Sequence, residues 1–145
     1  MRRGAAILGA VGVLVVSGPA FAAHGKAGLW DLSVTVSAPG MDHPQVVSNQ
    51  HCMTAGEVAS PGLSAPSQSG CSMQNAQTEG TTLSGDLVCT GEHKGSGHMT
   101  VTYDSPEHYS GTMTFTSTAD DGTSVAVSQK MEGRWVSASC GNVMK

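Results

Sequence analysis

The sequence predicts an all-β domain: an antiparallel meander of about eight short strands, forming a strongly curved sheet or an up-and-down, barrel-like arrangement. Apolar and polar residues alternate with period two along the chain, and no window of helical length shows a 3.6-residue period. Short segments rich in Gly, Asp and Pro separate the alternating runs, as turns do between strands. A sandwich of two packed sheets is the alternative architecture.

The first 22 residues have the features of a signal peptide. A basic start, Met1-Arg2-Arg3, precedes an apolar run over residues 5–16, and Ala20-Phe21-Ala22 matches the small-x-small cleavage pattern. The apolar run is too short to span a bilayer. We therefore expect residues 1–22 to be removed, leaving a single β domain over residues 23–145 with no transmembrane segment. The expected location is the periplasm, with secretion as the alternative.

The charge balance of the remaining chain disfavours some classes of partner. Without Arg2 and Arg3, five basic and eleven acidic residues remain, a net charge of −6 with neutral histidines. A negative chain without a basic cluster argues against nucleic acid and anionic membrane surfaces as partners. Aromatic residues make up only 4% of the chain, so we expect a thin core of Val, Leu and Met with covalent support.

Alternation is clearest in the first predicted strand, which ends before Pro39-Gly40. Apolar and polar residues occupy alternate positions: Trp30, Leu32, Val34 and Val36 on one face, and Asp31, Ser33 and Thr35 on the other. A second strand is expected from Gln45 to Cys52. The long loop that follows it contains Thr54-x-x-Glu57, a capping-box pattern that could start a short helical turn.

Four cysteines, Cys52, Cys71, Cys89 and Cys140, form an even set in a chain expected to be exported, which predicts two disulfides. The metal alternative is weak because no C-x-x-C pair occurs and the spacings are long. Sequence alone permits three pairings of four cysteines.

The hairpin expected over residues 71–89 selects one pairing. A register with Gln77 opposite Leu83 also places Cys71 opposite Cys89. Directly opposite residues have Cβ atoms about 4.5–5.5 Å apart, near the separation that a disulfide needs. We therefore predict a Cys71–Cys89 disulfide, conditional on this register.

The remaining pairing is then Cys52–Cys140, which would tie an early strand to the last one. Such a tie favours a closed or nearly closed sheet. Glu132-Gly133 leads to the last expected strand, from Arg134 to Cys140.

Two further hairpins are expected before that strand. The first turns at residues 105–107 and pairs Tyr103 with Tyr109 and Met99 with Met113. Aromatic and apolar pairs then coincide on one face, while threonines occupy the other. The second turns at Asp120-Asp121-Gly122, a three-residue loop with Gly in the left-handed position.

These residues together resemble the exported Gram-negative bacterial family called domain of unknown function 3617. The resemblance covers nearly the whole mature chain and rests on ordered motifs: Gly28-Leu29-Trp30-Asp31, Pro39-Gly40-Met41, Gln50-x-Cys52-x-Thr54, Gly70-Cys71, Cys89, Tyr109-Ser110-Gly111-Thr112-Met113-Thr114, Gly133-Arg134 and Cys140. The chain has Asp31 where members often carry Glu, and Ala138 where they often carry Gly. The resemblance implies a periplasmic β-rich domain and no particular activity.

The leading functional hypothesis is a non-enzymatic binding or structural module of the cell envelope. A curved meander offers a concave apolar face for an apolar or amphiphilic small ligand, or for an envelope protein. An open sheet edge would instead favour a protein partner that adds a strand. Trp30 and Trp135 are interpreted as core residues rather than the lining of a ligand cavity, and no cofactor is expected.

Two alternatives belong to other classes. A periplasmic copper protein could use Met41, His43, His51 and Met53, because thioether and imidazole groups suit copper. Other methionines fall at inward strand positions, where Met is ordinary core filling. An enzyme is disfavoured because the sequence has no nucleophile elbow, zinc-protease, phosphate-loop or dinucleotide motif.

Overall fold

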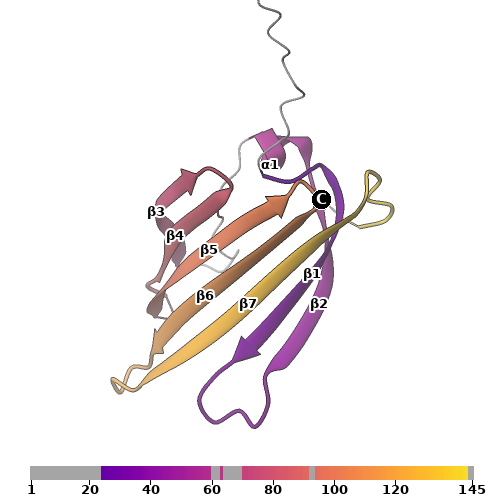
Figure 1. Ribbon diagram of the computed structural model, residues 1–145. Helices are drawn as coiled ribbons and strands as arrows, with labels where there is room; N and C mark the ends of the chain where they lie inside the picture. Colours follow the sequence, from indigo (N-terminus) through magenta and orange to yellow (C-terminus); the bar gives the residue numbers. More distant parts are fainter. Residues whose placement is uncertain (1–23, 60–62, 64–69, 92–93, 144–145) are drawn as a thin grey trace, which may run out of the picture.

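The computed structural model describes residues 24–59, 63, 70–91 and 94–143, so the predicted signal peptide lies outside the described residues. The described chain forms one antiparallel sheet and one short helix, which confirms the all-β antiparallel prediction (Figure 1). Its elements are β1 (Gly28–Ser37), β2 (Gln45–Met53), α1 (Ala55–Ala59), β3 (Cys71–Glu79), β4 (Thr82–Cys89), β5 (Gly95–Ser105), β6 (His108–Thr118) and β7 (Ser124–Ser137).

The strand order is β2-β1-β7-β6-β5-β4-β3. Strands β3 to β7 form a meander, and β7 returns beside β1, so the first and last strands of the chain are neighbours. The sheet is therefore open between β2 and β3, the strands that flank the longest connection, residues 54–70. It is neither closed into a barrel nor, in the described residues, packed on a second sheet.

The expectation of near-closure was wrong, although the disulfide on which it rested is present. Cys52 of β2 is bonded to Cys140, just beyond β7. Only β1 separates these two strands in the sheet, because β1 pairs with β2 on one side and with β7 on the other. The disulfide thus spans one strand at one end of an open sheet and does not require the two edges to meet.

The described chain has seven strands rather than about eight, because the strand expected from Arg134 to Cys140 is the last part of a longer strand, β7. Strand β7 runs without interruption from Ser124 to Ser137, and Gly133 lies opposite Tyr109 of β6. A Cβ atom at Gly133 would collide with the Tyr109 ring. The glycine therefore permits an aromatic ring to lie flat on the sheet, a role that sequence alone does not distinguish from a turn.

The predicted hairpin registers are confirmed between β5 and β6, where Tyr103 opposes Tyr109 and Met99 opposes Met113. In the β3–β4 hairpin, Cys71 opposes Cys89 as expected. Nearer the turn, however, Leu83 faces Thr78 instead of Gln77, because an irregularity between Gln74 and Gln77 shifts the register by one. Asn75 has a φ of 50° there, as an unpaired residue in a bulge often does.

The capping box predicted at Thr54-x-x-Glu57 starts helix α1. The Glu57 N–H donates to Thr54 Oγ1 at 3.3 Å, and the Thr54 N–H donates to Glu57 Oε2 at 2.6 Å. That second bond lowers the pKa of the Glu57 carboxyl below its ordinary value. The helix begins directly after β2 and turns the chain away from the open edge.

Candidate binding site on the apolar face

Strand pairing divides the sheet into two chemically different faces, because residues directly opposite one another point to the same side. The registers place Trp30 with Trp135, Val34 with Met131, and Phe115 with Val127 on one side, here called the apolar face. Its apolar members are Trp30, Leu32, Val34, Val36, Val47, Met73, Leu83, Leu87, Met99, Val101, Tyr103, Tyr109, Met113, Phe115, Val125, Val127, Met131 and Trp135.

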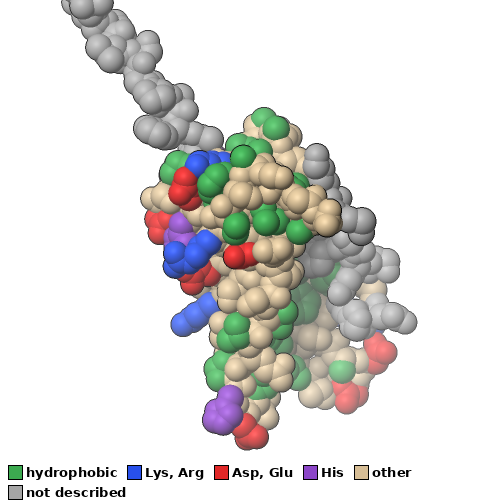
Figure 2. All heavy atoms as spheres, turned by 90° about the vertical axis from the view of Figure 1, so that its right-hand side faces the viewer, with side chains coloured by type: hydrophobic (Ala, Val, Ile, Leu, Met, Phe, Trp, Pro, Cys, Tyr) green, Lys and Arg blue, Asp and Glu red, His purple; other side chains and the backbone are tan. Residues whose placement is uncertain are grey.

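No Asp, Glu, Lys or Arg of the seven described strands lies on the apolar face. All of them point to the opposite side, here called the polar face: Asp31, Glu79, Asp86, Asp104, Lys130, Glu132 and Arg134. Figure 2 looks on to the β2 side of the molecule, and the Lys and Arg side chains that it shows gather along one side of the view. The separation of charged side chains from the apolar face is therefore a property of the whole sheet and not of one strand.

One end of the apolar face is a packed core. Trp30 is fully buried, and Leu83, Val101 and Tyr103 are nearly so. The aromatic rings of Trp30, Tyr103 and Tyr109 contact one another with centroids 5.2–6.3 Å apart, and Met53 and Leu63 pack against this cluster. Burial raises the pKa of Tyr109 to about 12, so its hydroxyl stays uncharged.

The segment before β1 closes this packed end. Trp30 Nε1 donates to the Lys26 carbonyl at 2.9 Å, and Trp135 Nε1 donates to the Ala27 carbonyl at 3.1 Å. The Lys26 ammonium lies 4.0 Å from the Trp135 ring centroid, and the His24 ring meets Tyr103 edge-on. These covering residues could not be predicted from the sequence, because no periodic pattern marks an irregular segment.

The other end of the apolar face is open to solvent. Val47 of β2 is 57% exposed and Val125 of β7 is 44% exposed. Val34, Phe115 and Val127, which belong to the same half of this face, are only partly buried. Contiguous exposed apolar surface on a soluble domain marks an interaction or ligand site more often than an isolated exposed residue does. This open half is the candidate binding site.

The polar face has two adjoining hollows of about 480 and 410 Å³ that share Ser33 and Glu132 in their linings. Hydroxyl side chains of β1, β5 and β6 form the floor of the larger one, including Thr35, Thr100 and Thr112. The smaller one lies between β1, β2 and β7 and is lined by Asp31 and Arg134. Short hydroxyl side chains explain the depression, because they leave the centre of the sheet lower than its long charged neighbours.

A charged network flanks these hollows. His108 Nδ1 lies 2.7 Å from an Asp104 oxygen, and His108 Nε2 lies 3.0 Å from Glu132 Oε1. The same Glu132 oxygen accepts a 2.6 Å bond from Arg134. Glu132 and then Asp104 raise the pKa of His108, while His108 and then Arg134 lower the pKa of Glu132. Carboxylates on both ring nitrogens favour the doubly protonated imidazolium, which cannot act as a metal ligand.

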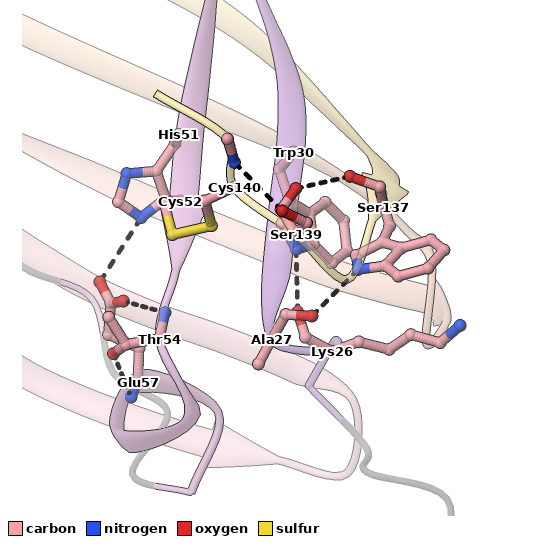
Figure 3. Close-up of a disulfide and its surroundings, with 12 residues drawn as sticks. Lys26, Ala27, Trp30, His51, Cys52, Thr54, Glu57, Ser137, Ser139 and Cys140 are labelled. Carbon is pink, nitrogen blue, oxygen red and sulfur yellow. Dashed lines mark hydrogen bonds and ion pairs between the residues drawn. A yellow bond between two sulfur atoms is a disulfide. The ribbon is translucent and has the colours of Figure 1, made fainter. Parts of the chain in front are cut away.

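Both disulfides support the edges of the sheet. Cys71–Cys89 links the two strands of the β3–β4 hairpin, with Cα atoms 4.0 Å apart. Cys52–Cys140 holds the segment after β7 against β2, with Cα atoms 5.5 Å apart (Figure 3). Cys52 is 2% exposed, and the bond lies beside the capped start of α1. The packed end of the apolar face is thus covalently fixed on the β2 side.

The four residues of the copper hypothesis fall into two separate pairs. Met41 and His43 lie in the β1–β2 connection, whereas His51 and Met53 lie at the far end of β2. His43 precedes the first residue of β2, and the strand from Gln45 to His51 alone spans about 20 Å. His51 Nε2 lies 3.5 Å from Glu57, and Met53 packs on the core. No cluster of three or more His, Cys, Asp or Glu side chains suited to a metal occurs among the described residues.

Comparison with known proteins places the chain in a family without supplying an activity. Among the described residues, no helix has the length and apolar character needed to cross a membrane. No curated protein and no solved structure matches the chain. The sequence model of the family described as "Protein of unknown function (DUF3617)" matches residues 25–140, from the covering segment before β1 to the last cysteine. The chain belongs to the DUF3617 family.

Proposed function

We propose that the protein is an exported, non-enzymatic binding module that holds an elongated amphiphile, such as a fatty acyl chain, against the open half of its apolar face. The observation that carries the proposal is the complete separation of charge between the two faces of an open sheet. The apolar face of a sheet is normally covered by other parts of the fold or by a bound partner. Here the described residues bury one end of that face and leave the other end exposed.

The chemistry of the open half fits an aliphatic chain. Its apolar side chains are valines, methionines and one phenylalanine on β1, β2, β6 and β7. They lie beside the uncharged Gln129, and there is no acidic or basic side chain to desolvate. Gly95 and Gly97 lie beneath Phe115, so its ring lies close to the sheet and the face stays low there. Ligand sites of this kind are mostly apolar, with few polar groups that set orientation.

Binding is favoured over catalysis by the residues available on that face. Tyr103 and Tyr109 have pKa values raised above the ordinary value by burial, and His51 is held by Glu57. Neither arrangement supplies a poised acid, base or nucleophile. Export is supported by the signal-like first 22 residues and by two disulfides, which persist in oxidising compartments.

The test is a titration of the purified protein with cis-parinaric acid, a fatty acid whose fluorescence rises in apolar surroundings. Val127→Glu places a carboxylate on the apolar face, and Ala126→Glu places the same group on the adjacent, exposed polar-face position of β7. We expect saturable binding by the wild-type protein, affinity lowered by at least about tenfold in V127E, and little change in A126E. Equal affinity of both variants, with both folded by circular dichroism, would refute the proposed site.

A further inference from the structure

The two edges of the open sheet differ in how well they are protected against strand addition. Edge strand β3 carries an irregularity between Gln74 and Gln77, with Asn75 in the left-handed region, and is tied to β4 by a disulfide. Bulges of this kind disrupt the regular ladder that an added strand would need. Edge strand β2 pairs with β1 in one continuous register of nine residues with no irregularity.

Strand β2 also lacks the side chains that normally guard an edge. Its sequence, QVVSNQHCM, contains no Lys, Arg, Asp, Glu or Pro. Val46 and Val47 are 64% and 57% exposed, the highest values among the exposed large hydrophobic residues of the described chain. Residues 45–50 are exposed on the free side of the sheet, whereas Cys52 is buried at the disulfide end. An exposed, uncharged, regular edge is a ready template for another strand.

We propose that residues 45–49 of β2 pair antiparallel with the same residues of a second copy, forming a two-fold symmetric dimer with one continuous sheet. A two-fold axis perpendicular to the sheet keeps the apolar faces of both copies on the same side. Directly opposed residues of two antiparallel strands point to the same face, so each apolar-face residue of one copy must oppose an apolar-face residue of the other. The register centred on Val47 meets this condition, puts Val47 against its own copy and places Val46 opposite Ser48.

A second copy fits this edge better than a foreign strand because the edge is self-complementary. Two-fold pairing brings identical side chains together, and in β2 this causes no like-charge repulsion. The pairing covers the two exposed valines of each copy at once. Closed two-fold dimers are also the commonest assemblies of soluble proteins. The inference concerns the edge and stands whether or not the apolar face binds an amphiphile.

The register predicts a specific cross-link. Cys71 and Cys89, which directly oppose each other in β3 and β4, show that a directly opposed pair in this sheet accommodates a disulfide. Val47→Cys should therefore form an intermolecular disulfide under mild oxidation. Val125→Cys is the control, since Val125 is similarly exposed on the same face but lies on an interior strand.

Sedimentation equilibrium of the purified protein, at concentrations up to about 100 µM, measures the assembly directly. We expect a concentration-dependent dimer, conversion to a monomer by Val47→Lys, and an unchanged dimer in Val125→Lys. A wild-type protein that stays monomeric would overturn the proposal. A dimer that survives Val47→Lys, or in which V47C cross-links no faster than V125C, would also overturn it.

Discussion

The two disulfides should contribute unequally to stability, because they close loops of different length. Cys52–Cys140 spans 88 residues and Cys71–Cys89 spans 18. The loop-closure relation then gives about 4.6 kcal/mol for the first and about 3.2 kcal/mol for the second. The smaller loop lies within the larger one, which shortens the larger loop and lowers its value by only about 0.2 kcal/mol. The expected difference is therefore slightly above 1 kcal/mol.

The perturbation is removal of each disulfide by paired Cys→Ala substitution, at residues 52 and 140 or at residues 71 and 89. Urea unfolding followed by tryptophan fluorescence measures the free energy, since Trp30 is fully buried and Trp135 partly buried in the packed end. Each pair contains one buried cysteine, Cys52 or Cys89, so a cavity cost applies to both and leaves the difference in loop length to decide the order. A larger loss on removing Cys71–Cys89 would refute the reasoning from loop length.

Two further predictions concern particular side chains. Gly133→Ala should cost about 1–3 kcal/mol, because the added Cβ meets the Tyr109 ring. Gly56→Ala in α1 makes only an ordinary van der Waals contact with Thr54 and should be neutral or stabilising in the same urea assay. The raised pKa of His108 means that its ion pairs stabilise the fold below its unfolded value near 6.5 and are lost as pH rises through the folded value. Because the pKa of Glu132 is lowered, its ion pair with His108 persists as pH falls through the ordinary carboxyl pKa near 4.5. The destabilisation caused by His108→Gln should therefore be greatest between these values and shrink towards pH 8; a pH-independent difference in melting temperature would contradict this assignment.

Local features of the sheet could be predicted from sequence. Short turns fix the registers of Tyr103 with Tyr109 and Phe115 with Val127, so alternation alone identifies their common face. The Cys71–Cys89 pairing followed from a hairpin register that is correct at that end. In each case the residues that meet are close in sequence, and turn length restricts how they can pair.

Long-range features could not be predicted in the same way. The pairing of β1 with β7 joins residues about a hundred positions apart, and no turn constrains it. The opening between β2 and β3, and with it the exposed edge, depends on that pairing. The segment at residues 24–27 accepts hydrogen bonds from Trp30 and Trp135 with backbone carbonyls, which leave no signature in side-chain type.

For the same reason, the candidate site could be predicted only in part from the sequence. The apolar alternation indicated a face, but burial of one end and exposure of the other depend on which segments cover the sheet. His51 and Met53, one pair of the soft-ligand hypothesis, lie two positions apart on β2. The structure places that pair beside the core and Glu57, far from Met41 and His43. The composition shows which side chains are able to bind a soft metal, but it does not show where the fold places them.

We expect the open half of the apolar face to carry an amphiphile when the protein is isolated. Native mass spectrometry of protein prepared without detergent or chelator tests this claim most directly, because the mass of any cargo identifies its class. We predict an organic adduct in the mass range of a fatty acid or lipid, retained by A126E and lost by V127E. A protein free of organic adduct, or one carrying only a metal ion, would contradict the account.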